Sequence, residues 1–324
     1  VASMRTTVPA CVTGVAGVLF LAALPPSRLT AQTTAITNAT VYPVSGPKLE
    51  HATVVIQKGK IAAVGTSVTI PSDATRIDGS GKIVTPGLFH ARSTLGLSDV
   101  GSVDNTNESS HAGDINASFA VAEGIDPATP IIPVARLEGV TTAVTIPTSG
   151  LIQGQAALIG LNGTRVEALV RKSPAALVID LSENSKGAGG GSRAGVLQRL
   201  RQLFLDAQEY ERRKAEFRKN AMQQLSAPAA ELEALGPALR GEEPVMAYAN
   251  RESDIMSALR LAKEFKLRLV IAGGIDGWKV APALAEAKVP VIINPINNIP
   301  TFDGLGARFD AAALMDKAGV PVIV

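Results

Sequence analysis

The chain has 324 residues, of which 46% are hydrophobic and 19% charged, and its formal net charge is +2. This composition excludes an intrinsically disordered chain and supplies enough apolar side chains for one large α/β domain and a small accessory domain. Aromatic residues make up only 4% of the chain. With so few stacking side chains and so little net charge, nucleic acid is not the expected partner.

Residues 1–31 carry the pattern of a secretory signal peptide. Arg5 precedes a mostly apolar stretch over residues 8–24, which two prolines and a short, mostly polar segment follow. Because this stretch is short and glycine-rich for a membrane span, we expect cleavage near Ala31 and a periplasmic or secreted protein without stable membrane insertion. A retained membrane anchor is the alternative.

Cleavage at this point would remove Arg5 and Arg28 but no acidic residue. Of the 31 basic side chains 29 then remain, against 29 acidic ones, so the mature chain carries no net formal charge. Cleavage would also remove Cys11, the only cysteine of the sequence. The mature chain is therefore expected to contain neither a disulfide nor a thiolate metal site.

Residues 32–84 are predicted to form a small β domain. Gly59, Gly65 and the Gly79-Ser80-Gly81 segment supply the reversals between short runs that are typical of strands. The runs are AITNATVYPV, ATVVIQ, KIAAVG and TRIDGSGKIV. The pattern favours a small antiparallel sheet.

From residue 85 to residue 324 the pattern changes to strands that alternate with helices, which indicates parallel βα units. Strands are expected at residues 140–146, 176–180, 245–249, 267–271, 289–294 and 320–324. Helices are expected at residues 254–265, 278–287 and 307–318. This regular spacing favours an α/β fold, a TIM-like (β/α) barrel, over a sandwich.

Two features depart from a regular barrel. Residues 192–237 are mostly helical in pattern and include the charge-dense stretch EYERRKAEFRKN, which is typical of a solvated helical hairpin inserted in the barrel. A lid or a partner-binding arm is the alternative. The sequence also stops on an apparent strand at 320–324, and we expect the barrel to be incomplete here.

A specific combination of motifs runs through residues 58–96. Gly59-Lys60-Ile61, Asp78-Gly79-Ser80-Gly81 and Thr85-Pro86-Gly87-Leu88 follow one another in this order. The passage resembles the segment of amidohydrolases of the imidazolonepropionase and dihydroorotase kind that leads from a small β-sandwich into the first barrel strand. Residues 244–295 resemble the barrel half of the same proteins. The resemblance therefore implies a small β-sandwich domain over 32–84 and an amidohydrolase-like barrel over 85–324.

The resemblance also implies a chemistry, the hydrolysis of non-peptide carbon–nitrogen bonds. In this family one or two divalent metals, commonly zinc, sit at the carboxyl ends of the barrel strands. The cation lowers the pKa of a bound water and polarises the scissile carbonyl. The metal is thus the cofactor that the family leads one to expect.

The ligand positions of the family are occupied differently in this chain. The family motif PGLIDxHxH places His90 at the position of Asp, Arg92 at the first His and Thr94 at the second His. A later strand that commonly supplies a His carries Tyr248 at the matching position. Because a guanidinium cannot act as a ligand and repels cations, the resemblance implies a degenerate metal-binding motif.

Two residues are candidates for catalysis. His90 could serve as a general base at the end of the first barrel strand, although a lone histidine is more often structural. Asp180 ends the apolar run ALVID, where a barrel places functional carboxylates, and a capping or loop role is an equal alternative.

Four residues are candidates for binding a small-molecule ligand. Arg92 could hold an anionic group where a metal would otherwise sit, or could pair with a carboxylate at a strand end. Tyr248 would share that region, and Asn250 and Asn294 lie at strand ends, where an amide can bind a ligand or stabilise a turn. Two functions remain open at this point: a hydrolase of the family kind, and a non-catalytic exported protein that binds a ligand in the barrel pocket.

Overall fold

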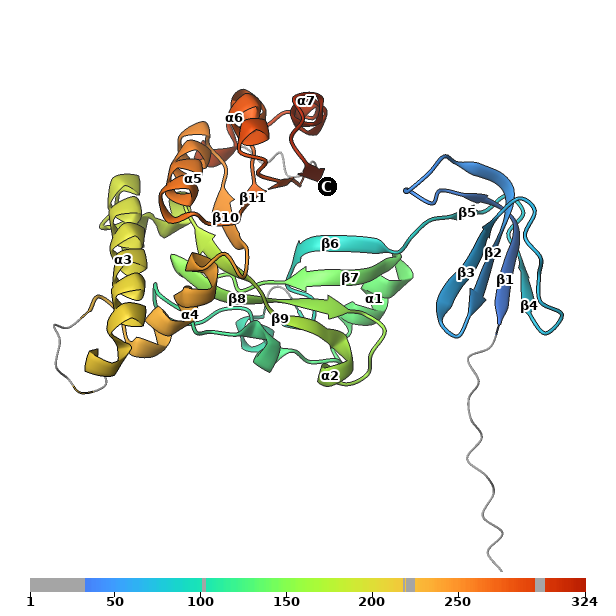
Figure 1. The fold of residues 1–324 in the computed structure, drawn as a ribbon, viewed down its shortest axis with the longest axis horizontal. Coiled ribbons are helices and arrows are strands. Elements are labelled where there is room, and N and C mark those ends of the chain that lie inside the picture. The colour runs from blue at the N-terminus through green and yellow to red at the C-terminus, as the bar shows by residue number, and fades with distance from the viewer. Residues whose placement is uncertain (1–32, 101–102, 218, 220–224, 295–300) are drawn as a thin grey trace, which may run out of the picture. The chain divides into compact units, whose positions relative to one another are not determined.

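The computed structural model describes residues 33–100, 103–217, 219, 225–294 and 301–324, which form two compact units, one ending at Pro86 and the other beginning at Gly87 (Figure 1). The expected signal peptide lies outside the described residues. None of the helices in the described part of the chain combines the length and the apolarity needed to cross a membrane.

The first unit is a single five-stranded sheet. Its strands are β1 (Thr34–Val41), β2 (Leu49–Gln57), β3 (Lys60–Gly65), β4 (Thr75–Asp78) and β5 (Ile83–Val84). The order is β3-β2-β1-β4, and β5 also pairs with β1. The expected antiparallel sheet is wrong in part, because β4 and β5 both run parallel to β1. The expected sandwich is not confirmed, since the described residues of this unit provide one sheet only.

Local chemistry explains two of the motifs in this sheet. Lys58 and Gly59 both have positive φ, 51° and 72°, which gives the tight two-residue turn that joins β2 to β3. After β4, the Asp78 carboxylate accepts hydrogen bonds from the N–H (3.0 Å) and hydroxyl (2.5 Å) of Ser80. The backbone N–H of Gly79 donates to the Thr37 carbonyl at 2.7 Å, an approach that a larger side chain would block.

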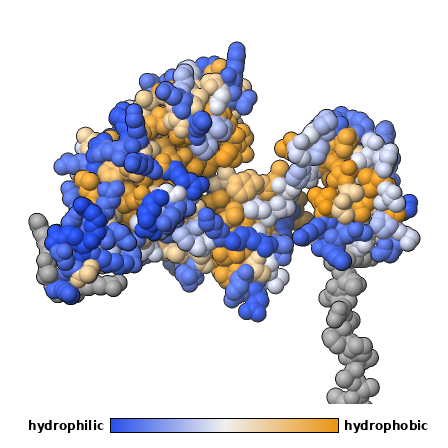
Figure 2. Space-filling model, in the orientation of Figure 1, coloured by the Kyte–Doolittle hydropathy of each residue, from blue (hydrophilic) through white to orange (hydrophobic). Residues whose placement is uncertain are grey.

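Apolar side chains stay exposed on this small unit. They include Ile61, Ile77 and Ile83, which are 68%, 48% and 67% exposed, and Figure 2 shows apolar residues gathered on its visible face. The buried residues are smaller, chiefly Ala39, Val41 and neighbours on β1 and β2.

The second unit is built on an eight-stranded, barrel-like sheet. Its strands are β6 (Leu88–Ser93), β7 (Val140–Thr145), β8 (Ile152–Gly160), β9 (Val170–Asp180), β10 (Val245–Ala249), β11 (Leu269–Gly273), β12 (Val291–Ile292) and β13 (Val322–Ile323). They lie in chain order from β6 to β13. The mixed α/β class and the expected strands from residue 140 onward are thus observed, with shifted ends at β9, β11, β12 and β13.

One strand was missed, and it breaks the parallel pattern. β8 runs antiparallel to both β7 and β9, whereas the other neighbouring pairs of this sheet are parallel. Only the six residues 146–151 separate β7 from β8. A parallel connection needs a crossover of a dozen or so residues, so this short link permits only an antiparallel pair.

Helices cover one face of this sheet (Figure 1). The α-helices are α1 (Ile131–Leu137), α2 (Val166–Leu169), α3 (Arg193–Phe217), α4 (Ala229–Leu239), α5 (Glu252–Phe265), α6 (Ala281–Glu286) and α7 (Ala311–Lys317). The short 3-10 helices are η1 (Asp104–Thr106), η2 (Val121–Gly124), η3 (Glu183–Gly189), η4 (Gly277–Val280) and η5 (Phe302–Gly304). The predicted helices at 254–265, 278–287 and 307–318 correspond to α5, η4 with α6, and α7.

The expected solvated hairpin at 192–237 is wrong for most of its length. α3 and α4 form the crossover between the parallel strands β9 and β10, and they bury Leu200, Phe204 and Leu235 against the sheet. The Phe204 ring meets the Phe265 ring of α5 edge-on, with centroids 5.2 Å apart. The charge-dense end of α3 is solvated, and there Glu209 pairs with arginines one turn away.

We predict that truncation at Phe204 tests this packing. Phe204→Ala should lower the free energy of unfolding by about 3–5 kcal/mol, because it removes a buried ring from the core. The control is the next residue, Leu205, which is 52% exposed; Leu205→Ala should change stability by no more than about 0.5 kcal/mol. Urea unfolding of both variants measures the difference. Equally small effects would mean that α3 does not pack on the sheet through Phe204.

Candidate functional site

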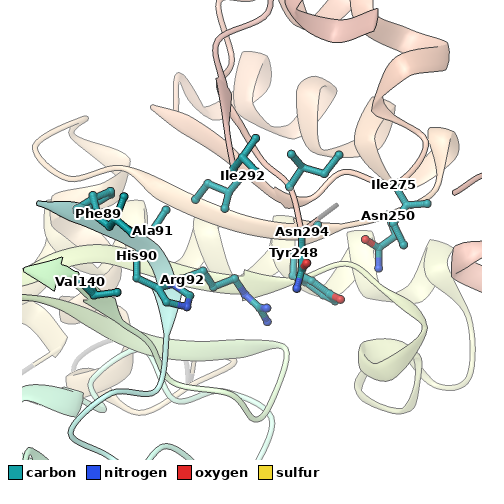
Figure 3. Close-up of a pocket in the computed structure, with 14 residues that line it drawn as sticks. Phe89, His90, Ala91, Arg92, Val140, Tyr248, Asn250, Ile275, Ile292 and Asn294 are labelled. Carbon is teal, nitrogen blue, oxygen red and sulfur yellow. The ribbon is translucent and has the colours of Figure 1, made fainter. Parts of the chain in front are cut away.

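A cavity of about 500 Å³ in the second unit runs along β6 and reaches the carboxyl ends of β10, β11 and β12 (Figure 3). It brings together residues that are far apart in the sequence, namely His90 and Arg92 of β6 with Tyr248 of β10. Asn250, just after β10, and Asn294, beyond β12, also line it. The four proposed binding residues and His90 therefore share one cavity, and part of its lining lies at the carboxyl ends of strands, where barrel enzymes carry their active sites.

Strand alternation explains why these side chains converge. Along β10, Val245 and Ala247 join the core against the helices, whereas Met246 and Tyr248 point to the opposite, inner face of the sheet. Tyr248 pairs in register with Asp180 of β9. Asp180 thus lies on the inner face beside Tyr248, although it does not line the cavity itself.

Arg92 is held against an aromatic ring. The carbon at the centre of its guanidinium lies 4.6 Å from the centroid of the Tyr248 ring, a cation–π contact that Figure 3 shows from the side. In the described part of the chain, no carboxylate comes within ion-pairing distance of this guanidinium and no acceptor receives a hydrogen bond from it. The contact places the guanidinium beside the ring and leaves its N–H groups available.

Asp180 is a buried carboxylate, only 4% exposed. Burial raises its pKa, while hydrogen bonds from Ser182 and the positive charge of Arg92 oppose this shift. One carboxylate oxygen accepts the backbone N–H of Ser182 at 2.7 Å. The result is a carboxylate whose basicity is greater than usual, next to a cavity.

Asn250 contributes a second buried polar group. It is 5% exposed, and its Oδ1 has no hydrogen-bond partner among the described residues. The wall behind it is Gly273, where an added Cβ would lie 2.3 Å from that oxygen and 3.0 Å from the Tyr248 ring. Gly273 also has a φ of 93°, so both its space and its backbone conformation require glycine.

The remaining two candidates lie at the margin of the cavity. His90 and Asn294 are both exposed, as is Arg92, whereas Tyr248 is half-buried. His90 comes from β6, where the register with β7 shifts between His90 and Ser93. The geometry therefore gives Asp180, rather than His90, the more enclosed position for proton transfer.

An ionic network that the sequence did not reveal joins the segments that follow β9, β10 and β12. Asp303 accepts ion pairs from Arg193 and Arg251, each at 2.8 Å, and Arg193 also reaches Asp254 at 2.9 Å. Asp303 further accepts the backbone N–H of Glu183 at 3.0 Å. The sequence signal that could have indicated this network is a charged residue in the segment that follows each of these strands. The network ties these loops together next to Asp180, whose pKa the charge of Asp303 helps to raise.

The residues of the site do not fit a divalent metal. Arg92 and Tyr248 occupy two positions that the family resemblance assigns to metal ligands, and here they contact each other. Thr94 occupies the third position. In the ranges that the structure describes, no three His, Cys, Asp or Glu side chains converge as a metal-binding group. We therefore assign no chemical step to a metal.

Comparisons with known proteins point to one superfamily. No family model matches the sequence. The chain is 26% identical over 242 residues to the curated Amidohydrolase tasK of Hapsidospora irregularis, a match that covers 66% of this chain and 25% of tasK. The chain thus spans about a quarter of the length of that relative.

Solved structures agree with this similarity. A crystal structure of an amidohydrolase from Thermotoga maritima MSB8 is 27% identical, with a TM-score of 0.80 over 89% of this chain and 77% of that one. A triazine hydrolase variant is 17% identical, with a TM-score of 0.50 over 90% of this chain and 70% of that one, and shows the fold alone.

We predict a pH-dependent cost of burying Asp180. Because burial raises its pKa above that of the unfolded chain, its contribution to stability is fully present below the unfolded pKa and is lost as the pH rises through the folded pKa. Asp180→Asn should therefore unfold at a higher urea concentration than the parent at pH 8, and the difference should shrink toward pH 4.

The control residue for this experiment is Asp310, whose pKa is shifted in the opposite direction. A hydrogen bond from Arg308 lowers the pKa of Asp310, so its contribution is present above the unfolded pKa and is lost as the pH falls. Asp310→Asn should not be more stable than the parent at pH 8. A gain from Asp180→Asn that stays constant between pH 4 and pH 8 would contradict the burial argument.

We further predict that histidines at the two substituted positions restore metal binding. Arg92→His combined with Thr94→His removes a positive charge and supplies imidazoles at the two positions that the family resemblance assigns to metal ligands, and with the Asp180 carboxylate they would make a three-ligand set. Zinc affinity measured by calorimetry should rise by about tenfold or more over the parent. Arg92→Gln combined with Thr94→Ala removes the charge without adding ligands, and an equal rise in that control would sink the prediction.

Proposed function

We propose that this chain, whose homologues support the amidohydrolase superfamily and a hydrolase function at family level, hydrolyses a non-peptide carbon–nitrogen bond of a small molecule. The observation that carries the proposal is the position of Asp180. It is a buried carboxylate of raised pKa on the inner face of the sheet, beside the cavity that Arg92 and Tyr248 line.

The residues support a mechanism based on a general base. Asp180 takes a proton from a water molecule, whose oxygen attacks the carbonyl carbon of the substrate. The proton then passes to the leaving nitrogen as the carbon–nitrogen bond breaks. A raised pKa suits both steps, because the carboxylate is a stronger base and its acid form persists closer to neutral pH.

Arg92, Tyr248 and Asn250 act in this scheme as binding residues. Tyr248 orients the guanidinium of Arg92, and Asn250 presents an amide from the cavity wall. His90 is a second candidate for the base, and its exposed position on β6 is the reason for ranking it below Asp180. The non-catalytic alternative has no support from the comparisons, and the activity test below separates it from the hydrolase.

We predict that Asp180→Asn abolishes most of the hydrolysis. The purified full-length chain is screened against small amides, ureides and lactams, and each substrate found is tested on the variant. Loss of a general base should lower kcat/KM by about 10²- to 10⁴-fold. His90→Gln should have a much smaller effect if Asp180 is the base.

Glu243 offers a matched control for this experiment. It is another buried carboxylate, 3% exposed, whose pKa burial raises, but it precedes the amino end of β10, whereas Asp180 is paired with Tyr248 near the carboxyl end of that strand. Glu243→Gln should keep the parental kcat/KM. Equal losses in both variants would indicate a general effect on folding. No turnover of any substrate by the parent would favour the binding protein.

A further inference from the structure

We infer that the cavity selects a small amide that carries one carboxylate and an apolar body, with the carboxylate bound by Arg92. The inference rests on the proposed function for the ligand's role as a substrate and deepens it by naming the class of molecule. It is argued from the charge, the shape and the polar groups of the cavity lining.

The first argument is the unused hydrogen-bonding capacity of Arg92. Two other arginines of this unit, Arg193 and Arg251, are neutralised by Asp303 at 2.8 Å. Arg92 has no such partner among the described residues, and Asp180 influences it through charge without forming an ion pair at close range. A guanidinium in contact with a ring still offers a planar fork of N–H donors, and a carboxylate matches that fork in geometry and charge.

The second argument is the overall charge of the lining. Among the side chains of the fourteen described residues around the cavity, that of Arg92 carries the one permanent charge, and none belongs to an aspartate, a glutamate or a lysine. A cationic ligand would meet repulsion from Arg92 with no compensating carboxylate side chain in the lining. The single positive charge of Arg92 balances one carboxylate, whereas it balances only half the charge of a phosphate dianion.

The third argument concerns the rest of the ligand. The lining beyond Arg92 is mostly apolar, with Phe89, Val140 and Ile292 among its members. Asn250 adds a polar side chain that is more than nine-tenths buried and has an unpartnered Oδ1. An amide group of the ligand can face this side chain, while its apolar body packs on the walls. The volume of about 500 Å³ lies within the range of small-molecule sites.

The experiment compares charged and neutral probes of the same shape. N-Acetylglycine, N-benzoylglycine and N-benzoyl-β-alanine are titrated into the full-length chain by calorimetry, each beside its neutral carboxamide. At least one acid should bind about tenfold or more tightly than its carboxamide. The preference should weaken as salt is added, because it depends on charge.

Variants then assign the preference to a residue. Arg92→Gln should bind acid and carboxamide equally, and Arg92→Lys should keep only part of the preference, because lysine retains the charge but loses the fork. Arg165→Gln, which changes an arginine on the far surface with an 80% exposed side chain, should behave as the parent. Circular dichroism confirms that each variant is folded.

The outcomes separate this inference from the proposed function. Equal binding of every acid and its carboxamide, no binding of any probe, or a preference that survives in Arg92→Gln would each overturn the inference. Turnover is followed separately by release of the amine. A carboxylate preference that depends on Arg92 but comes without any turnover would support the inferred ligand class and contradict the proposed hydrolase function. Turnover of neutral amides without a carboxylate preference would support the hydrolase function and contradict the inferred ligand class.

Discussion

The register between β9 and β10 is the constraint on which the rest of the site depends. Because Asp180 and Tyr248 are paired, strand alternation sends both side chains to the face of the sheet that the helices leave uncovered. The Tyr248 ring then receives the guanidinium of Arg92 from β6. A slip of one residue in either strand would turn its functional side chain toward the helices and replace it by an apolar one.

Charges near the cavity are held in two different ways. Asp303 gathers two arginines and fixes the loops that follow the strands, so this network is internally neutralised. Asp180 and Arg92 lack such close partners and remain able to act on a ligand. Burial of Asp180 costs stability at neutral pH, and this cost is the physical basis of its increased basicity. The structure thus separates charges that support the loops from charges that can do chemistry.

Much of the second unit could be predicted from sequence, because strands such as 245–249 and helices such as 254–265 have clear periodicity and length. β8 could not be assigned in the same way, since a search for alternating βα units passes over a hairpin strand. The expectation of a solvated hairpin gave the charges near Glu209 more weight than the apolar stripe that includes Phe204, although that stripe packs on the sheet. Arg92 and Tyr248 were identified from the resemblance, and Asp180 and Asn250 from their places at strand ends. The contact between Arg92 and Tyr248 required the fold.

The antiparallel strand β8 also bears on how the sheet assembles. β7, β8 and β9 follow one another with short connections, so their pairing closes small loops at low entropic cost. β6, by contrast, joins β7 only after the long segment between Ser93 and Val140 has been ordered. Folding of the barrel is therefore expected to start at the centre of the chain, in this three-stranded meander. Arg92 arrives on β6 as a late addition, and the site becomes complete only near the end of folding.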